Sequence, residues 1–316
     1  MAVTIVIVNW NSGALLERTL AALARQTLRP DEVLVFDNNS DAPPVAICQA
    51  VGARLIASEQ NIGFAAANNR AIDQCTTEYV ALLNPDAFPE PDWLESLVGA
   101  ARDSVAYAAF GSRQLTVADP NILDGTGDVY HLSGLAWRNR YGAQQGPVDL
   151  VAREMFSPCA AAALYRREAL VTVGGFDEDF FCYFEDVDLG FRLRLAGYRC
   201  LYVPQAVVHH VGSATTGGGQ SDFSVYYGHR NLTWAFVQNM PGALFWLLAP
   251  LHVAAAVLEI GVYLARGRAP TIFRAKRDAI AAWPRVWKKR KAIQVNRVAT
   301  VAEIWRALDK WPFSWA

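Results

Sequence analysis

The stretch that most constrains the fold is residues 79–87, where an apolar run ends abruptly in Asn84, Pro85 and Asp86. The run has the length of a strand buried on both faces, as in a parallel sheet covered by helices. Proline ends the strand because it has no N–H to donate. Asp86 is therefore expected just past the carboxyl end of a central strand, where open α/β sheets bind ligands. A carboxylate there can hold a divalent cation or cap a helix over residues 89–101.

Strand-like and helix-like segments alternate along the first hundred residues. Strands are predicted at residues 2–8, 32–36, 54–57 and 79–83, and helices at 13–26, 45–50 and 65–75. This alternation predicts an α/β fold with a mostly parallel central sheet. Ser12 is the expected N-cap of the first helix. Polar clusters follow the strands at 9–12, 37–41 and 84–86, and polar groups gathered along one sheet edge form a nucleotide-sized crevice.

Missing phosphate loops exclude several nucleotide-binding classes. Neither GxGxxG nor GxxxxGK[ST] is present, which argues against a dinucleotide oxidoreductase and a P-loop ATPase. Residues 9–13 also lack the glycine- and arginine-rich loop expected of a sugar nucleotidyltransferase. The five cysteines form no CxxC pair, which argues against a disulfide framework or a zinc site.

A second group of carboxylates lies among aromatic residues between 174 and 189. Glu185, Asp186 and Asp188 open a predicted helix over residues 185–196, where the helix dipole favours charged acids. A helix start needs only one such acid, and burying several is costly without cations or hydrogen-bond donors. Further strands are predicted at 105–110, 156–165 and 198–203, and the last leads to the pair His209-His210. Residues 125–146 are interpreted as a loop over the site, without individual assignments.

Eight motifs together resemble a known enzyme family. In order they are VIVNWNS (6–12), RQT (25–27), VFDNNSD (35–41), NIGFAAANN (61–69), LLNPDA (82–87), GGFDEDFF (174–181), FEDVDL (184–189) and VVHHVG (207–212). The chain resembles family 2 glycosyltransferases of the GT-A (nucleotide-diphospho-sugar transferase) fold, in particular bacterial rhamnosyltransferases acting on lipid-linked cell-surface glycans. The resemblance implies a glycosyltransferase domain over residues 1–235, followed by a helical, basic and membrane-associating region over 236–316.

The resemblance also implies roles for individual residues. Those expected to bind the nucleotide-sugar are Trp10, Asp37, Asn38, Asn61, Gly63, Asn68, Asn84 and Arg230. Asp86 is expected to coordinate Mg²⁺ or Mn²⁺ at the diphosphate. Of the two histidines, His209 fits the family position for the metal site better than His210, although the residues alone leave the choice open. Asp186 is the expected general base, supported by Glu185 and Asp188.

The implied function is the inverting, metal-dependent transfer of a sugar to a hydroxyl of a polyprenyl-diphosphate-linked glycan acceptor. The donor is dTDP- or UDP-linked, with dTDP-rhamnose the first choice and galactofuranosyl, mannosyl or N-acetylglucosaminyl donors as alternatives. Asn84 departs from the usual Asp-x-Asp metal motif and removes one anionic ligand. A catalytically silent nucleotide-sugar-binding subunit of a membrane complex therefore stays open as a second reading.

Residues 243–265 are apolar enough to suggest a membrane span, but Pro250, His252 and Glu259 interrupt them. An acid at mid-depth costs about 2.5 kcal/mol or more on insertion scales. An interfacial or re-entrant helix is the expectation, with a true span and a buried core helix as alternatives.

The following segment, 266–297, holds eleven basic residues and one acid, whereas the rest of the chain holds 18 basic and 29 acidic residues. Interleaved aromatic residues suit an anionic lipid surface. No nucleic-acid-binding fold precedes the segment, so nucleic acid is not an expected partner. We expect a peripheral enzyme on the cytoplasmic face of the inner membrane.

Overall fold

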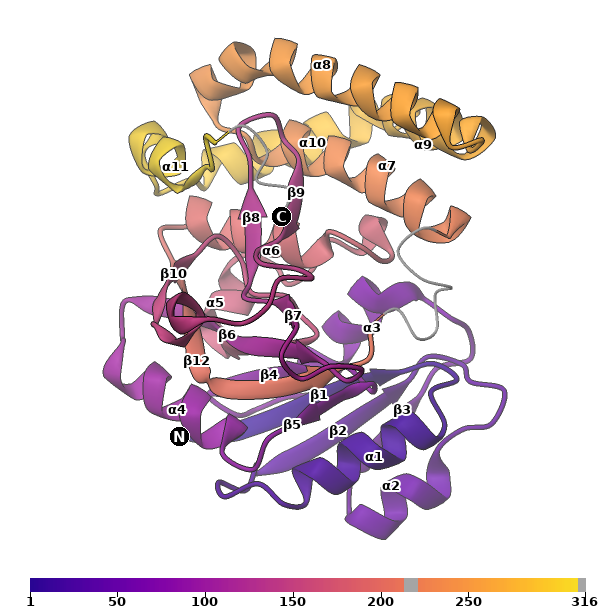
Figure 1. Cartoon of the computed structure of the whole chain (residues 1–316), viewed down its shortest axis with the longest axis vertical. Helices are drawn as coiled ribbons and strands as arrows, with labels where there is room; N and C mark the ends of the chain where they lie inside the picture. The colour runs from indigo at the N-terminus through magenta and orange to yellow at the C-terminus, as the bar shows by residue number, and fades with distance from the viewer. Residues whose placement is uncertain (213–220, 312–316) are drawn as a thin grey trace.

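The computed structural model describes residues 1–212 and 221–311. The central sheet has the strand order β10-β12-β6-β11-β4-β1-β2-β3 (Figure 1). Its strands are β1 (Val3–Asn9), β2 (Glu32–Asp37), β3 (Arg54–Ala57), β4 (Tyr79–Leu83), β6 (Tyr107–Thr116), β10 (Arg153–Met155), β11 (Ala162–Arg166) and β12 (Arg199–His210). Strands β3, β2, β1, β4, β6 and β12 share one direction, and β11 runs antiparallel between β4 and β6. The predicted α/β sheet is confirmed.

Helices cover the sheet on both faces because side chains along each strand alternate between them. Ile5 and Ile7 of β1 pack with α1 (Ala14–Leu23), α2 (Val45–Val51) and α4 (Trp93–Asp103). Val6 and Val8 pack on the other face with α3 (Gly63–Ile72), α5 (Arg167–Thr172) and α6 (Glu185–Leu195). The strands are therefore buried on both sides.

The carboxyl ends of the strands meet at one edge of the sheet. Asn9 pairs with Asp37 at the ends of β1 and β2, and β12 runs beside β6 as far as His210. The short strand β5 (Ala87–Pro89) turns back from this edge and pairs antiparallel with the end of β12. The chain after Asn84 is thereby held close to His210.

At this edge one local prediction was wrong, and one alternative interpretation does not hold. The N-cap of α1 is Gly13 rather than Ser12, whose hydroxyl contacts the carbonyl of Trp10. Asp86 does not cap a helix, because β5 follows it and α4 begins only at Trp93. The carboxylate of Asp86 is therefore not used in helix capping and can bind a ligand in the crevice.

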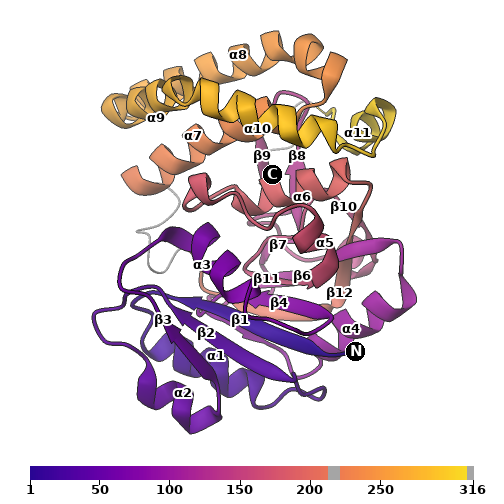
Figure 2. The same ribbon diagram turned by 180° about the vertical axis from the view of Figure 1, so that it is seen from behind.

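Within residues 221–311, five helices follow the sheet and form a cap over α6 and the hairpin of β8 (Asp128–Tyr130) and β9 (Ala136–Arg138) (Figures 1 and 2). They are α7 (Asp222–Asn239), α8 (Gly242–Ala265), α9 (Ala269–Ala281), α10 (Trp283–Val295) and α11 (Val301–Ala307). The predicted boundary after residue 235 falls inside α7. Strand β7 (Leu123–Gly125) extends the sheet beside β6.

Helix α8 is the one described helix that is long and apolar enough to cross a membrane, judged by length and composition alone. The two polar residues that interrupt its sequence face the protein. Glu259 pairs with Lys276 of α9 at 2.7 Å, and the ring of His252 stacks on Phe236 of α7. Its outward residues are apolar and exposed: Trp246, Leu247, Leu251, Val253, Val257, Leu258, Val262 and Leu264.

Candidate active site

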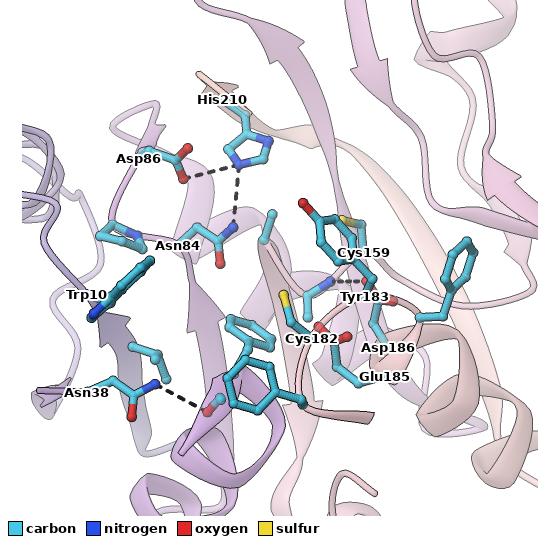
Figure 3. A pocket seen from close by; sticks show the side chains of 18 of the residues that line it. Trp10, Asn38, Asn84, Asp86, Cys159, Cys182, Tyr183, Glu185, Asp186 and His210 are labelled. Carbon is cyan, nitrogen blue, oxygen red and sulfur yellow. Dashed lines mark hydrogen bonds and ion pairs between the residues drawn. The ribbon is translucent and has the colours of Figure 1, made fainter. Parts of the chain in front are cut away.

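A hollow of about 380 Å³ opens at the carboxyl edge of the sheet (Figure 3). Predicted residues that line it are Trp10, Asn38, Asn61, Gly63, Asn84, Asp86, Glu185 and Asp186. The structure therefore brings the carboxylates at positions 86 and 186 to one cavity, although a hundred residues separate them in the chain. In Figure 3 Trp10 and Asn38 lie on one side, Glu185 and Asp186 on the other, and Asp86 with His210 between and above.

Amide side chains shape the end of the hollow near Trp10. The Nδ2 of Asn38 donates to Asn61 Oδ1 at 2.9 Å, and Asn38 Oδ1 accepts from the backbone N–H of Ile62 at 2.9 Å. Gly63 has a φ of 84°, and a Cβ there would lie 2.4 Å from the ring of Phe181. Only glycine allows this approach of α3 to the loop that precedes α6. The indole of Trp10 is 38% exposed and can flank a planar base.

Three residues predicted to bind the nucleotide-sugar do not line the hollow. Asp37 is buried and accepts hydrogen bonds from Asn9 Nδ2 at 2.7 Å and from the Ser40 hydroxyl at 2.6 Å. Asn68 donates to the carbonyl of Phe64 on its own helix. Arg230 donates to the carbonyls of Asp179 and Phe180 and stacks on Trp234. Asp37 and Arg230 thus connect separate segments around the hollow, whereas the hydrogen bond of Asn68 stays within α3.

Asp86 lies against His210, not His209. Its Oδ1 is 3.2 Å from His210 Nε2, and Asn84 Nδ2 is 3.5 Å from the same nitrogen. His209 instead contacts Glu90 at 2.7 Å, because successive residues of β12 face opposite sides of the sheet. The geometry therefore does not support His209 as the histidine of this site and puts His210 in its place.

A carboxylate fixes the other nitrogen of His210. Its Nδ1 is 2.7 Å from Asp124 Oδ2, and that oxygen also accepts a hydrogen bond from Arg138 at 2.5 Å. Burial lowers the pKa of His210, but hydrogen bonds with Asp124 and Asp86 outweigh it and raise the pKa above the ordinary histidine value. A carboxylate on the far nitrogen is the usual outer partner of a metal-binding histidine.

The donor set around Asp86 fits a divalent cation with few protein ligands. It consists of one carboxylate, one imidazole nitrogen and the amide of Asn84, and such oxygen and nitrogen donors suit Mn²⁺ or Mg²⁺. Within residues 1–212 and 221–311, no three His, Cys, Asp or Glu side chains form a metal cluster. A cation here would therefore need further oxygen ligands, which a diphosphate supplies.

Three carboxyls gather near the start of α6: Glu185 and Asp128 are buried, and Asp186 is partly buried. Asp186 Oδ2 accepts from the backbone N–H of Ala160 at 3.1 Å, and its Oδ1 accepts from Val187 N–H at 2.9 Å. Burial raises the pKa of Asp186 above the ordinary aspartate value. Burial and the charge of Asp186 raise the pKa values of Glu185 and Asp128 further. Of the three, Asp186 has the best-defined hydrogen bonds and is suited to accept a proton.

Asp188, which was expected to support the base, does not line the hollow. Its side chain is fully buried and binds Arg192 at 2.7 Å, Gln238 at 2.5 Å and Asn239 at 2.6 Å. It therefore fastens α6 to α7 behind the site.

The loop that precedes α6 forms a wall of the hollow through Phe181, Cys182 and Tyr183. Phe181, Tyr183 and Phe184 have φ values of 65°, 68° and 63°, a strained conformation for side chains of this size. Such strain persists only where surrounding contacts enforce it.

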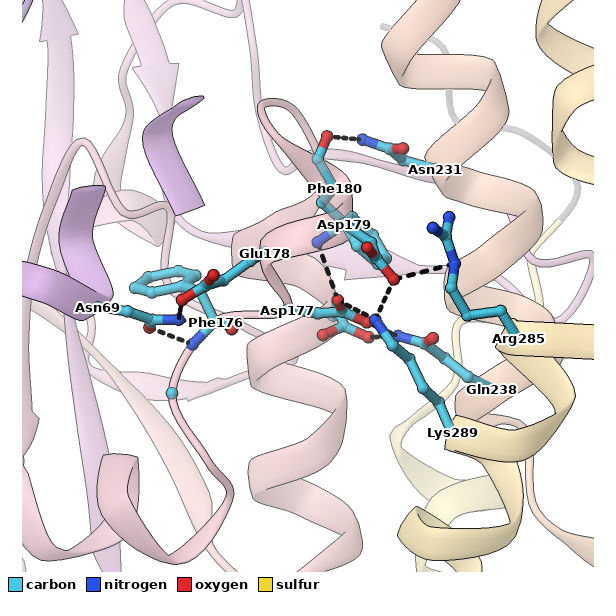
Figure 4. A network of polar contacts seen from close by, with 12 residues as sticks. Asn69, Phe176, Asp177, Glu178, Asp179, Phe180, Asn231, Gln238, Arg285 and Lys289 are labelled. Atoms are coloured by element: carbon cyan, nitrogen blue, oxygen red, sulfur yellow. Dashed lines mark hydrogen bonds and ion pairs between the residues drawn. The ribbon is translucent and has the colours of Figure 1, made fainter. Parts of the chain in front are cut away.

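Contacts from the cap and from α3 hold this strained loop (Figure 4). The Asn231 amide donates to the carbonyls of Phe180, Cys182 and Tyr183 at 2.8–3.0 Å. Lys289 of α10 binds the carboxylates of Asp177 and Asp179. On the other side, Asn69 of α3 binds both backbone polar groups of Phe176. The helical cap thus shapes the active-site wall.

Several residues that line the hollow had not been predicted individually. Asp128, Trp137 and Arg138 come from the β8–β9 hairpin, in the segment interpreted only as a loop over the site. Alternating side chains in Asp128-Val129-Tyr130 could have indicated a strand, but three residues are too few to establish a period of two.

The chain is similar in sequence and in fold to known glycosyltransferases. The model of glycosyl transferase family 2 matches residues 4–174. N-acetylglucosaminyl-diphospho-decaprenol L-rhamnosyltransferase of Mycobacterium tuberculosis is 32% identical over 280 residues, which cover 78% of this chain and 87% of that protein. The O-antigen chain rhamnosyltransferase RfbN of Salmonella typhimurium is 26% identical over 231 residues, covering 72% of this chain and 71% of RfbN.

A solved structure shares the fold over nearly the whole chain. The mannosyltransferase PcManGT from Pyrobaculum calidifontis, solved with GDP-Man and Mn²⁺, superposes with a TM-score of 0.55 at 19% identity, covering 96% of this chain and 87% of that one. The chain is thus a glycosyltransferase of the GT-A fold. It belongs to glycosyl transferase family 2.

Proposed function

We propose that this enzyme transfers a sugar with inversion from a nucleotide-diphospho-sugar, best dTDP-L-rhamnose, to a hydroxyl of a polyprenyl-diphosphate-linked glycan. The observation that carries the proposal is that Asp86 and Asp186 line one hollow, at separate positions around it. One carboxylate serves the leaving diphosphate and the other the incoming hydroxyl. The L-rhamnosyltransferase relative, which spans most of this chain, supports the choice of sugar and acceptor.

The residues divide the work along the hollow. Trp10 and Asn38 flank the nucleotide, and Asn84, Asp86 and His210 face the diphosphate. Asp186 takes the proton from the acceptor hydroxyl, and a positioned general base contributes about 10²–10⁴-fold to such a step. No carboxylate is needed as nucleophile, so a single displacement inverts the anomeric centre.

Asp86, His210 and Asn84 would hold a Mg²⁺ or Mn²⁺ ion together with diphosphate oxygens. When bound, the ion offsets the negative charge that builds up on the leaving group. Asp124 keeps the imidazole of His210 oriented toward Asp86, and Arg138 in turn holds Asp124.

We further propose that α8 lies in the plane of the cytoplasmic leaflet as the peripheral anchor of the enzyme. Its apolar residues face outward, while Glu259 and His252 face α7 and α9. A spanning helix would have to leave these partners and expose an unpaired acid to lipid. The figures show α8 at the end of the molecule remote from β2 and β3 (Figures 1 and 2).

Purified full-length enzyme tests the proposed reaction. It is incubated with Mn²⁺ and an N-acetylglucosaminyl diphosphate carrying a short prenyl chain, together with dTDP-rhamnose, UDP-galactofuranose, GDP-mannose or UDP-N-acetylglucosamine. Rhamnosylated product with inverted anomeric configuration is the expected result. Transfer from another donor would correct the sugar alone. Nucleotide-sugar binding without transfer from any donor would favour a catalytically silent subunit.

A further inference from the structure

Asp128 lines the hollow but has no assigned part in the reaction. It opens β8, is 5% exposed, and faces the charges of Asp186 and Glu185. Within the described part of the chain, no group donates a hydrogen bond to its Oδ2, and the same holds for Oε2 of Glu185. Buried polar atoms in proteins are nearly always paired. Two buried acceptors beside the proposed base are therefore available to a ligand.

The chemistry of this corner fits a neutral ligand with hydroxyl groups. Three acidic side chains disfavour a phosphate. A cation is disfavoured because Arg138 already lies beside them and because the described residues form no three-ligand acidic cluster. Burial and the charge of Asp186 raise the pKa of Asp128 well above its ordinary range. A protonated carboxyl both donates and accepts a hydrogen bond, as a sugar hydroxyl does.

The position of Asp128 indicates that the sugar it would bind is the acceptor rather than the donor. Asp128 and Trp137 line the active-site hollow and also a second hollow of about 530 Å³, bounded by the β8–β9 hairpin, β10 and residues 307–311. In a single displacement the acceptor approaches from the side opposite the leaving diphosphate. The second hollow adjoins the corner of Asp186, whereas Asp86 and His210 line only the first.

We propose that Asp128 binds a hydroxyl of the acceptor sugar beside Asp186, with Trp137 packing against the sugar ring, and so determines acceptor specificity. This inference rests on the proposed function and names the subsite that its acceptor occupies. An indole supplies an apolar face for the ring. A site built to bond a hydroxyl rejects the analogue that lacks it.

Acceptor analogues that each lack one hydroxyl test this inference against Asp128→Ala. For the wild-type enzyme, removal of one particular hydroxyl should raise the acceptor KM about tenfold or more. Asp128→Ala should raise the KM of the complete acceptor by a similar factor and abolish the penalty for that one deoxygenation. The KM for dTDP-rhamnose should stay within about twofold, and Asp128→Asn should recover much of the acceptor affinity.

Asp119→Ala is the matched control, because Asp119 is an exposed acid of the same segment that lines neither hollow. Unfolding temperatures are measured for every variant. If Asp128→Ala fails to fold, Asp128→Val replaces it, because valine fills a similar volume without a hydrogen-bonding group. An unchanged acceptor KM, or a deoxygenation penalty that persists in the variant, overturns the inference while transfer by the wild-type enzyme leaves the proposed function intact. Absence of transfer by the wild-type enzyme overturns the proposed function and this subsite with it.

Discussion

At the scale of single residues, the direction of a side chain on β12 decides which histidine serves the site. His209 and His210 are adjacent in sequence, yet they contact Glu90 and Asp86 respectively. His209 is partly exposed beside the partly exposed Glu90, whereas His210 is buried between two carboxylates. The pair thus offers a matched comparison within one strand.

His210→Ala should lower kcat/KM about 10- to 100-fold, the range for loss of groups that hold or orient a metal. The Mn²⁺ concentration for half-maximal rate should rise as well. His209→Ala should change both quantities less than about threefold. Steady-state rates over a Mn²⁺ titration provide the measurement. Equal losses in the two variants would contradict the assignment of His210.

Asp186→Asn keeps the shape of the side chain and its contact with Ala160 but removes the base. We expect kcat to fall about 10²–10⁴-fold, with the dissociation constant of the nucleotide-sugar within about threefold. Calorimetric titration with the donor and single-turnover transfer assays separate the two effects. Retained turnover would exclude Asp186 as the base.

The pH dependence of the wild-type rate reports on the same carboxyl. Burial raises the pKa of Asp186, and a base acts only when deprotonated, so activity is present above that pKa and lost as the pH falls through it. The acidic limb of kcat/KM should therefore lie above about 3.9, the ordinary aspartate value. A rate profile with circular dichroism as folding control measures this, and a limb at or below that value would argue against a buried base.

At the scale of elements, the contact between α10 and the loop before α6 links the helical cap to catalysis. Lys289 binds Asp177 and Asp179, and Arg285 contacts Asp179 at 3.1 Å. Lys289→Met leaves these carboxylates without their main cation and should lower stability by about 1–3 kcal/mol. It should also lower kcat several-fold, because Phe181 and Tyr183 sit on the loop in strained conformations.

Lys288→Met is the control for this change, since its side chain lies on the exposed side of α10. Thermal unfolding and kcat are measured for both variants. A stable Lys289→Met enzyme with unchanged kcat would show that the ion pairs do not position the wall.

The elements with long sequence patterns could be predicted, and the elements with short patterns could not. The long apolar run of β4 and the proline after it predicted the strand and the place of Asp86 at its end. The acids at the start of α6 were likewise predictable as a group, because the helical pattern behind them is eleven residues long. Strands β5, β8 and β9 have three residues each, too few for a period. Because β8 and β9 could not be predicted, Asp128 and Trp137 were not predicted as residues of the site.

At the scale of the whole molecule, the helical cap connects the active-site wall to the apolar outer face of α8. Helices α7 and α10 contact the loop that precedes α6. Both also pack with α9, which in turn packs against α8. The outer face of α8 is apolar, and several basic side chains after it are exposed, among them Arg277 and Lys291. Docking through this face would bring a membrane-held acceptor to the same end of the enzyme as the cap.

The double variant Trp246→Glu with Leu258→Glu tests this docking. Each native side chain is more than 60% exposed, so neither change opens a cavity in the core. Burial of such side chains in lipid contributes about 1.5–3 kcal/mol each, so vesicle binding should weaken on the order of a hundredfold or more. Flotation with anionic vesicles measures the binding. Val105→Glu is the matched control, because Val105 is an exposed residue between α4 and β6.

Transfer to a soluble short-chain acceptor should stay unchanged, while transfer to a long-chain acceptor in vesicles should fall with binding. High salt should release part of the wild-type enzyme, because basic residues near a charged surface contribute about 1 kcal/mol each. Wild-type and double-variant enzymes that both resist salt and float equally would contradict an in-plane helix and favour a span.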